Sequence, residues 1–237
     1  MIPYSTKSGN LNCMPHQVTL LSVGFVTHDV KRYITSKPDG YLFTPGQATS
    51  VFLDKPGLRD NKRSFTFSSR PADKILEFTI KSYHDHNGVT HTLWEAKPGD
   101  TLHIGEPKGA IKYTKPGLFL AAGAGITPFL SIFRELWANG ELHKCFLLYS
   151  NKTKGDIISE HELTHYFSQP ENDILLTLTR KSAIGYISGR ITENIINEFC
   201  PNCLGNAYIC GPQAFVDTMR EIFTKKGVEQ DSIIFDK

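Results

Sequence analysis

The chain has 237 residues, of which 40% are hydrophobic and 21% are charged. This composition excludes a disordered or fibrous protein, and the length suffices for one large domain or two ordinary ones, each with its own core. The net charge of +2 is too small for the concentrated basic face of a nucleic-acid-binding protein, so partners have to be inferred from particular sites.

No membrane or secretory signal is expected from the sequence. Residues 1–10 lack the apolar stretch of a signal peptide. The longest uncharged run, residues 118–133, is shorter than a bilayer span and is interrupted by glycine and proline. We therefore expect a cytoplasmic protein without a transmembrane segment and without a membrane partner.

The cysteines and histidines do not form a recognisable metal site. Five cysteines are an odd number for a disulfide framework, and in a cytoplasmic protein the thiols should be reduced. Cys200 and Cys203 make one C-x-x-C pair, whereas a structural zinc site commonly needs two such pairs. The histidines between residues 84 and 91 lie around a glycine, which is more typical of a solvated hairpin. We expect no bound metal.

The first half of the chain has the pattern of strands. From Gln17 to about Ile111, short runs of Val, Ile, Phe, Tyr and Thr are separated by turn signals such as Lys37-Pro38-Asp39-Gly40. Residues 75–81 and 101–104 have the alternation or β-branched enrichment of strands. This half is predicted to form an antiparallel barrel or sandwich.

After Gly117, apolar strands alternate with helical stretches. The predicted strands are residues 118–122, 145–149, 174–179 and 206–210, and the predicted helices are residues 128–139, 160–167, 192–199 and 213–226. This βαβ order indicates a parallel sheet. The expected fold class is therefore β + α/β, with an N-terminal antiparallel β-barrel domain in residues 1–112 and a parallel-sheet α/β domain in residues 113–237.

A glycine-rich turn joins the first strand of the second half to its helix. It reads Gly123-Ala124-Gly125-Ile126-Thr127-Pro128. Glycines at such a turn let the backbone approach a diphosphate, and the helix N-terminus supplies free N–H groups and a favourable dipole. Pro128 suits the first helical position. The spacing is G-x-G-x-x-P and not the dinucleotide fingerprint G-x-G-x-x-G, so by itself it leaves a tight turn without a ligand as the alternative.

A cation, aromatic rings and hydroxyls occur together on one predicted strand, Arg63-Ser64-Phe65-Thr66-Phe67-Ser68-Ser69. Because a strand alternates its faces, the arginine and the two phenylalanines share one side and the hydroxyls the other. Arginine can pair with phosphate, an aromatic ring can cover a flavin face, and a hydroxyl can bond the redox-active ring nitrogen. The alternative is an ordinary edge strand with a surface arginine.

These segments resemble the motifs of the ferredoxin-NADP reductase superfamily, and the resemblance extends from Val18 to the end of the chain. The family order is R-x-[Tyr or Phe]-[Ser or Thr], a glycine near a serine or threonine, G-x-G-x-x-P and C-G-P. Here the motifs stand as Arg63 to Thr66, Gly88-Val89-Thr90, Gly123 to Pro128 and Cys210-Gly211-Pro212. Tyr149-Ser150-Asn151-Lys152-Thr153, with Asp156-Ile157-Ile158 and Glu162-Leu163, further resembles the NADH-cytochrome reductase branch.

The resemblance implies a barrel that binds FAD, an α/β domain that binds NAD(P), and a ring stack between them. Arg63 and Thr90 would hold the diphosphate, Phe65 would lie on the isoalloxazine, and Thr66 would sit near its N5 nitrogen. Cys210 would lie near the nicotinamide carbon that donates hydride; a buried inert thiol is the alternative. The expected catalytic residues are Thr66 and Cys210, and the expected cofactor-binding residues are Arg63, Ser64, Phe65, Thr66, Ile80, Lys81, Tyr83, Gly88, Val89, Thr90, Gly123, Ala124, Gly125, Thr127, Pro128, Lys152, Thr179, Arg180, Cys210, Gly211, Pro212 and Phe235.

The choice of dinucleotide is predicted from the strand ends. Lys152, Thr179 and Arg180 flank the presumed 2′ position without a carboxylate among them, which favours NADPH. The Asn151-Lys152-Thr153 context resembles NADH users, so NADH stays possible, and solvated loop charges are the alternative. Phe235, two residues before the end, is the candidate for the terminal aromatic ring that stacks on the flavin in many family members.

We predict a ferredoxin- or flavodoxin-NAD(P) reductase-like flavoenzyme that transfers electrons between NAD(P)H and a small redox protein. One alternative is the reductase component of an oxygenase or hydroxylase, which would share every residue named above. Another is a flavin-binding electron-transfer subunit without nicotinamide turnover of its own. Such subunits carry an added cysteine cluster for an iron–sulfur centre, and Cys200-x-x-Cys203 provides too few ligands for one.

Overall fold

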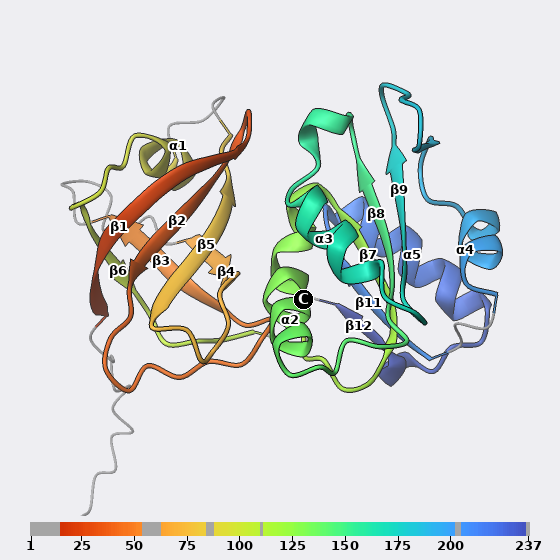
Figure 1. Ribbon diagram of the computed structural model, residues 1–237, viewed down its shortest axis with the longest axis horizontal. Helices are drawn as coiled ribbons and strands as arrows, with labels where there is room; N and C mark the ends of the chain where they lie inside the picture. Colours follow the sequence, from red (N-terminus) through yellow and green to blue (C-terminus); the bar gives the residue numbers. More distant parts are fainter. Residues whose placement is uncertain (1–14, 54–62, 84–87, 110, 202–204, 236–237) are drawn as a thin grey trace, which may run out of the picture.

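The computed structural model describes residues 15–53, 63–83, 88–109, 111–201 and 205–235. They form two units that lie side by side, each built on a six-stranded sheet (Figure 1). The first sheet is antiparallel, with the strand order β4-β3-β6-β1-β2-β5. Its elements are β1 (His16–Thr27), β2 (Val30–Ser36), β3 (Ala48–Leu53), β4 (Arg63–Thr66), β5 (Ile75–Lys81), α1 (Val89–Trp94) and β6 (Thr101–Ile104).

The two ends of the antiparallel sheet meet. Phe67, directly after β4, forms an antiparallel bridge with Phe78 of β5. The Ser68 N–H donates to the Glu77 carbonyl at 2.8 Å. The sheet thus curls around a core that includes both phenylalanines, and the predicted antiparallel barrel is confirmed. The strands predicted at residues 75–81 and 101–104 coincide with β5 and β6.

The second sheet is parallel, with the order β10-β9-β8-β7-β11-β12, which confirms the predicted α/β class. Its strands are β7 (Gly117–Ala122), β8 (Phe146–Asn151), β9 (Asp173–Leu178), β10 (Ile187–Ser188), β11 (Asn206–Cys210) and β12 (Ile233–Phe235). The helices are α2 (Thr127–Ala138), α3 (Glu160–Phe167), α4 (Glu193–Phe199) and α5 (Gln213–Lys225), with 3-10 turns η1 (Gly123–Ile126), η2 (Lys154–Asp156) and η3 (Gln230–Ser232).

Helices cover both faces of the parallel sheet, which explains why its strands are apolar throughout. Along β7, Phe119 and Ala121 pack in one core with α2 and α3. Leu118 and Leu120 pack on the other face with α4 and α5. Figure 1 shows α2 and α3 in front of the sheet and α5 behind it.

Three expectations outside the sheets can be checked. Cys200, expected as a reduced thiol, is disulfide-bonded, whereas Cys145 and Cys210 form no disulfide. Cys203 lies outside the described residues. The hairpin expected around Gly88 is wrong for residues 89–94, which form α1. No helix in the described part of the chain has the length and apolar character needed to cross a membrane. The domain boundary predicted at residues 112 and 113 falls between β6 and β7 and stays a prediction.

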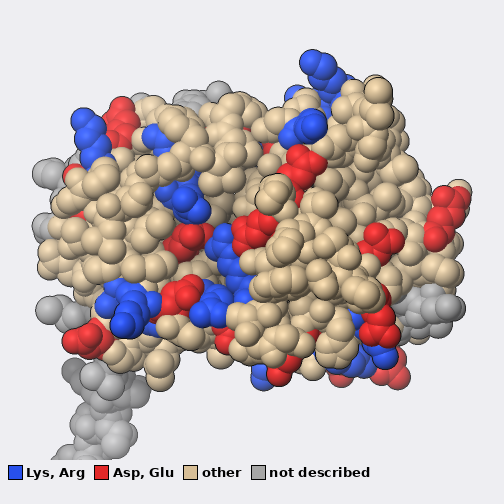
Figure 2. Space-filling model, in the orientation of Figure 1, with Lys and Arg blue, Asp and Glu red and all other residues tan. Residues whose placement is uncertain are grey.

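Arg134 of α2 joins the two units through a shared guanidinium. Its Nη1 donates to the Ser68 carbonyl and to Glu77 Oε1 of the barrel, both at 2.6 Å. Its Nε and Nη2 donate to the two carboxylate oxygens of Glu162 on α3, at 2.6 and 2.8 Å. Ser131, one turn earlier on α2, donates to the Ser69 carbonyl at 2.7 Å. In Figure 2, positive and negative side chains lie next to one another along the junction of the two units.

The Arg134 network is largely removed from solvent. The side chains of Arg134 and Glu77 are 17% and 10% exposed. Burial would raise the pKa of Glu162, but the paired guanidinium of Arg134 holds this pKa below its ordinary value of 4.5. Glu162 therefore stays ionised at neutral pH. Removal of Arg134 would leave this partly buried carboxylate without a cation, although the Tyr166 hydroxyl would still donate to it at 3.0 Å.

We expect Arg134→Met to lower the free energy of unfolding by about 3 kcal/mol at neutral pH. Breaking a buried ion pair leaves the remaining carboxylates buried without a counter-charge. Glu77→Gln alone should also destabilise, and the double variant should lose less than the sum of the two. Thermal or urea unfolding of the four proteins measures these differences.

The same comparison has a pH dependence. The pKa of Glu162 is lower in the folded than in the unfolded protein, so the Arg134 pair stabilises the fold at pH values above the unfolded-state pKa. This stabilisation is lost as the pH falls through the folded-state pKa. The gap between wild type and Arg134→Met should therefore narrow at acidic pH. Identical melting curves of the two proteins at pH 7 would contradict a stabilising bridge.

Candidate functional site

A cleft of about 780 Å³ lies between the barrel and the parallel sheet. It is lined by the carboxyl ends of β7, β8 and β11, by the start of α5, and by Val30, Lys81 and Tyr83 of the barrel. The chain builds the parallel sheet outward from β7 to β10 and then crosses to β11 on the other side of β7. Open α/β sheets bind ligands at this switch point of the strand order.

The predicted glycine turn forms one wall of the cleft. Gly123 has a φ of +53°, a left-handed conformation that favours glycine, and its carbonyl accepts a bond of 3.0 Å from the Tyr149 hydroxyl. Gly125 meets a different constraint, since a Cβ there would lie 2.3 Å from the Cys210 carbonyl oxygen. Pro128, expected at the first helical position, is the second residue of α2, which begins at Thr127. The glycine turn therefore packs directly against the C-G-P motif.

Thr66 and Thr127 bring the two halves of the predicted site together. Thr66 ends β4 of the barrel, Thr127 begins α2, and their hydroxyl oxygens are 2.6 Å apart. Either hydroxyl can be the donor. Because one hydroxyl must donate and the other accept, one proton remains for a third group that approaches this pair.

The cleft favours an anionic ligand. Lys81, Lys152 and Arg190 line it, together with a single carboxylate, Asp156. Lys152 and Arg190 form no ion pair within the described part of the chain. Backbone of the glycine turn and an excess of positive charge are the donors that a diphosphate requires, so the residues present fit a dinucleotide.

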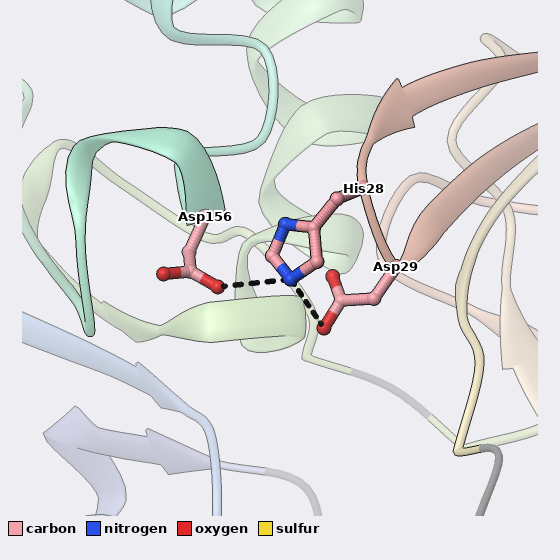
Figure 3. A group of neighbouring side chains, drawn as sticks. All are labelled: His28, Asp29 and Asp156. Atoms are coloured by element: carbon pink, nitrogen blue, oxygen red, sulfur yellow. Dashed lines mark ion pairs between the residues drawn. The ribbon is translucent and has the colours of Figure 1, made fainter.

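His28, Asp29 and Asp156 lie close together across the domain boundary (Figure 3). His28 Nε2 lies 3.7 Å from Asp29 Oδ2 and 3.9 Å from Asp156 Oδ1. Lys81 Nζ lies 2.7 Å from the same Asp29 oxygen. Burial would raise the pKa of Asp29, but the bond and charge of Lys81 lower it. A metal ion here would have to displace the ammonium group, so the geometry fits an ion-pair network better than a cation site.

The structure brings only part of the predicted site to the cleft. Phe65 is half-buried on β4, and Ile80 is buried in the barrel. Phe235 lies on β12 beside β11, with the Arg220 guanidinium 4.1 Å from its ring centroid. The predicted residues that line the cleft are Lys81, Tyr83, Gly123, Ala124, Gly125, Lys152, Thr179, Cys210, Gly211 and Pro212, and those that do not are Arg63, Ser64, Phe65, Thr66, Ile80, Gly88, Val89, Thr90, Thr127, Pro128, Arg180 and Phe235.

Sequence reasoning missed several cleft residues. Arg190 follows β10, and this strand of two residues is too short for a periodic pattern to reveal. Asn151 stood within a recognised segment but had no assigned role. The cleft residues without a predicted role are Val30, Ala122, Ser150, Asn151, Asp156, Ile158, Arg190, Ile191, Ala214, Phe215, Thr218 and Met219.

Comparisons with known proteins agree with this geometry. The family described as the oxidoreductase NAD-binding domain matches residues 119–221. NADH-cytochrome b5 reductase 1 of Eremothecium gossypii is 30% identical over 235 residues, which cover 90% of this chain and 80% of that protein. The reductase component of the naphthalene 1,2-dioxygenase/salicylate 5-hydroxylase systems of Ralstonia sp is 25% identical over 218 residues, and the match covers 89% of this chain but 65% of the relative.

A solved structure has the same arrangement of both units. The FAD/NAD-binding domain of nitric oxide dioxygenase from Vibrio cholerae matches with a TM-score of 0.84 at 19% identity, covering 94% of this chain and 98% of that one. At this identity the likeness establishes the fold.

Gly125→Ala should damage the protein more than Gly123→Ala. The new methyl at residue 125 would collide with the Cys210 carbonyl, whereas at residue 123 it would meet nothing within 4 Å and only the left-handed backbone would be strained. We expect losses of unfolding free energy of about 2–3 kcal/mol and about 1 kcal/mol respectively. Urea unfolding measures both. Equal losses would mean that the contact with Cys210 is not what requires glycine at residue 125.

Proposed function

The chain belongs to the ferredoxin-NADP reductase superfamily, and from this membership we propose that it passes electrons from NAD(P)H through FAD to a small redox protein such as ferredoxin or flavodoxin. As a member of the family it is an NAD(P)H-dependent flavin reductase. The observation that carries the proposal is the bond between Thr66 and Thr127, since it joins the flavin motif to the nucleotide motif beside the cleft.

In this proposal the protein positions the reactants and has little proton transfer to perform. Arg63 and Thr90 would hold the flavin diphosphate, and Phe65 would cover the ring. Thr66, fixed by Thr127, would offer its hydroxyl to the ring edge near N5. FAD, when bound, supplies the hydride acceptor and releases electrons singly or in pairs.

Cys210 would act at the nicotinamide end. It ends β11, lines the cleft and has its carbonyl packed under Gly125. With the backbone of Cys210 held in this way, its side chain would set how closely a nicotinamide approaches the Thr66 side of the cleft. Cys210 would thus control the geometry of hydride transfer while leaving flavin binding to the barrel.

A second candidate function is that of the reductase component of an oxygenase. It is supported by the similarity to the Ralstonia reductase component, of which the chain spans 65%. The similarity to a cytochrome b5 reductase supports a haem protein as a further class of acceptor. A flavin-binding subunit without nicotinamide turnover is less well supported, because the cleft has the cations and glycine turn that a dinucleotide requires.

For the dinucleotide we propose a preference for NADPH. Lys152 and Thr179 line the cleft, and Arg190 adds a cation that the sequence did not indicate. Arg180 follows directly after Thr179 and is exposed. A 2′-phosphate near these residues could gain one or two charge-assisted hydrogen bonds.

The purified chain should be yellow, and its flavin absorbance should bleach when NADPH is added without oxygen. Arg63→Ala should bind flavin roughly 30-fold or more weakly, because an unpaired diphosphate costs about 2 kcal/mol or more. Arg32→Ala on β2 is the matched control and should retain flavin. Full flavin content in Arg63→Ala would contradict the assignment of Arg63.

The ratio of kcat/KM for NADPH to that for NADH should exceed about tenfold in wild type, as one charge-assisted bond suffices for this preference. Arg180→Ala and Lys152→Ala should reduce the ratio, and Thr179→Asp should reverse it by repelling the phosphate. Lys74→Ala serves as the control, because Lys74 is an exposed cation before β5, at the opposite end of this strand from the cleft residue Lys81. A wild type that prefers NADH, with no change in Arg180→Ala, would count against NADPH.

A further inference from the structure

Asn151 carries a buried polar side chain that the fold does not satisfy. It ends β8, is 4% exposed and lines the cleft. Its backbone carbonyl accepts hydrogen bonds from the Thr179 N–H at 2.9 Å and the Thr179 hydroxyl at 3.2 Å. Its side-chain Nδ2 and Oδ1 have no hydrogen-bond partner among the described residues. The side chain therefore keeps both a donor and an acceptor unused.

The neighbouring Tyr149 hydroxyl does not provide the missing partner. This hydroxyl donates to the Gly123 carbonyl at 3.0 Å and accepts from the Ile158 N–H at 3.3 Å. Burial raises the pKa of Tyr149, and the nearby Asn151 amide opposes this effect without forming a hydrogen bond of normal geometry. Buried amides without partners are rare because they destabilise a fold, so the residue type at this position requires another reason.

We propose that Asn151 binds the dinucleotide by hydrogen-bonding a ribose hydroxyl through its carboxamide, an inference that rests on the proposed function of the cleft. A carboxamide offers donors and an acceptor together. A ribose hydroxyl can pair with both groups, because it can accept a hydrogen bond from the amide N–H and donate one to the amide oxygen. A phosphate at neutral pH mainly accepts hydrogen bonds. The unused pair on Asn151 therefore fits a sugar better than a phosphate.

The position of Asn151 along the sheet agrees with a sugar. The end of β8 lies between β7, where Ala122 pairs with Ser150, and β9, where Leu178 pairs with Asn151. The nicotinamide end of the cleft is expected beside Cys210, and the 2′ end beside Thr179. A dinucleotide that extends between these two ends has to pass the end of β8, where Asn151 stands.

The test is rapid anaerobic reduction of the FAD-loaded protein by NADPH and by NADH, which gives an apparent Kd and a limiting rate. Asn151→Leu should raise the apparent Kd about tenfold for the preferred dinucleotide, and Asn151→Ala should do the same without added bulk. Because the unsatisfied amide is gone, the melting temperature of Asn151→Leu in the absence of dinucleotide should equal or exceed that of wild type.

Thr177→Val is the matched control. The Thr177 hydroxyl is fully buried and has no partner among the described residues, but Thr177 does not line the cleft. Its replacement should leave the melting temperature equal or higher, as at Asn151, and leave the apparent Kd unchanged. An equal rise in Kd in Thr177→Val would overturn the proposal, since the effect would then not be specific to the cleft.

Three further outcomes distinguish the proposal from its premise and from a structural role of Asn151. Normal reduction of wild type with an unchanged Kd in both Asn151 variants overturns the role of Asn151 and leaves the proposed function standing. Absence of flavin reduction by either dinucleotide in wild type overturns the proposed function and with it this inference. A lower melting temperature in both Asn151 variants would assign the residue a structural role instead.

Discussion

The guanidinium of Arg134 fixes how the two units face each other. It holds the Ser68 carbonyl and the Glu77 carboxylate of the barrel and, with its other edge, the Glu162 carboxylate of α3. Because the same helix begins with Thr127, this attachment keeps the end of β4 against the start of α2, where Thr66 and Thr127 meet at 2.6 Å. The cleft is therefore shaped by an ion network that lies outside it.

Within the α/β unit, close packing sets the geometry and polar groups are left for a ligand. Gly125 allows the glycine turn to touch the Cys210 carbonyl, which brings β7 and β11 together at the switch point. On the β8 and β9 side, the buried Asn151 amide lies in the cleft without a hydrogen-bond partner among the described residues. A fold selected for stability alone would satisfy or remove such a buried amide, so its presence fits a site shaped for binding.

The sequence predicted those features that depend on neighbouring residues. The long apolar periods and the glycine and proline positions located β5, β11, α3 and the turn from Gly123 to Pro128. It missed β10 and β12, which have two and three residues, because no period is visible over that length. Arg134 looks like an ordinary surface cation of a helix, and its partner Glu77 is 57 residues away. The positions of Asn151 and Arg190 in the cleft likewise could not be predicted from neighbouring residues, because only the tertiary fold brings them together.

The cleft and the electron acceptor impose different requirements on this fold. Hydride transfer needs near contact between the reacting atoms, so under the proposed function it would depend on the fixed geometry around Thr127, Gly125 and Cys210. A protein acceptor is too large to enter a cleft of about 780 Å³ and has to approach the outer surface. The similar proteins have names that specify acceptors as different as cytochrome b5 and a dioxygenase system. Under the proposed function, a common site for electron input could therefore serve several acceptors, because a protein acceptor would contact an outer surface that hydride transfer does not constrain.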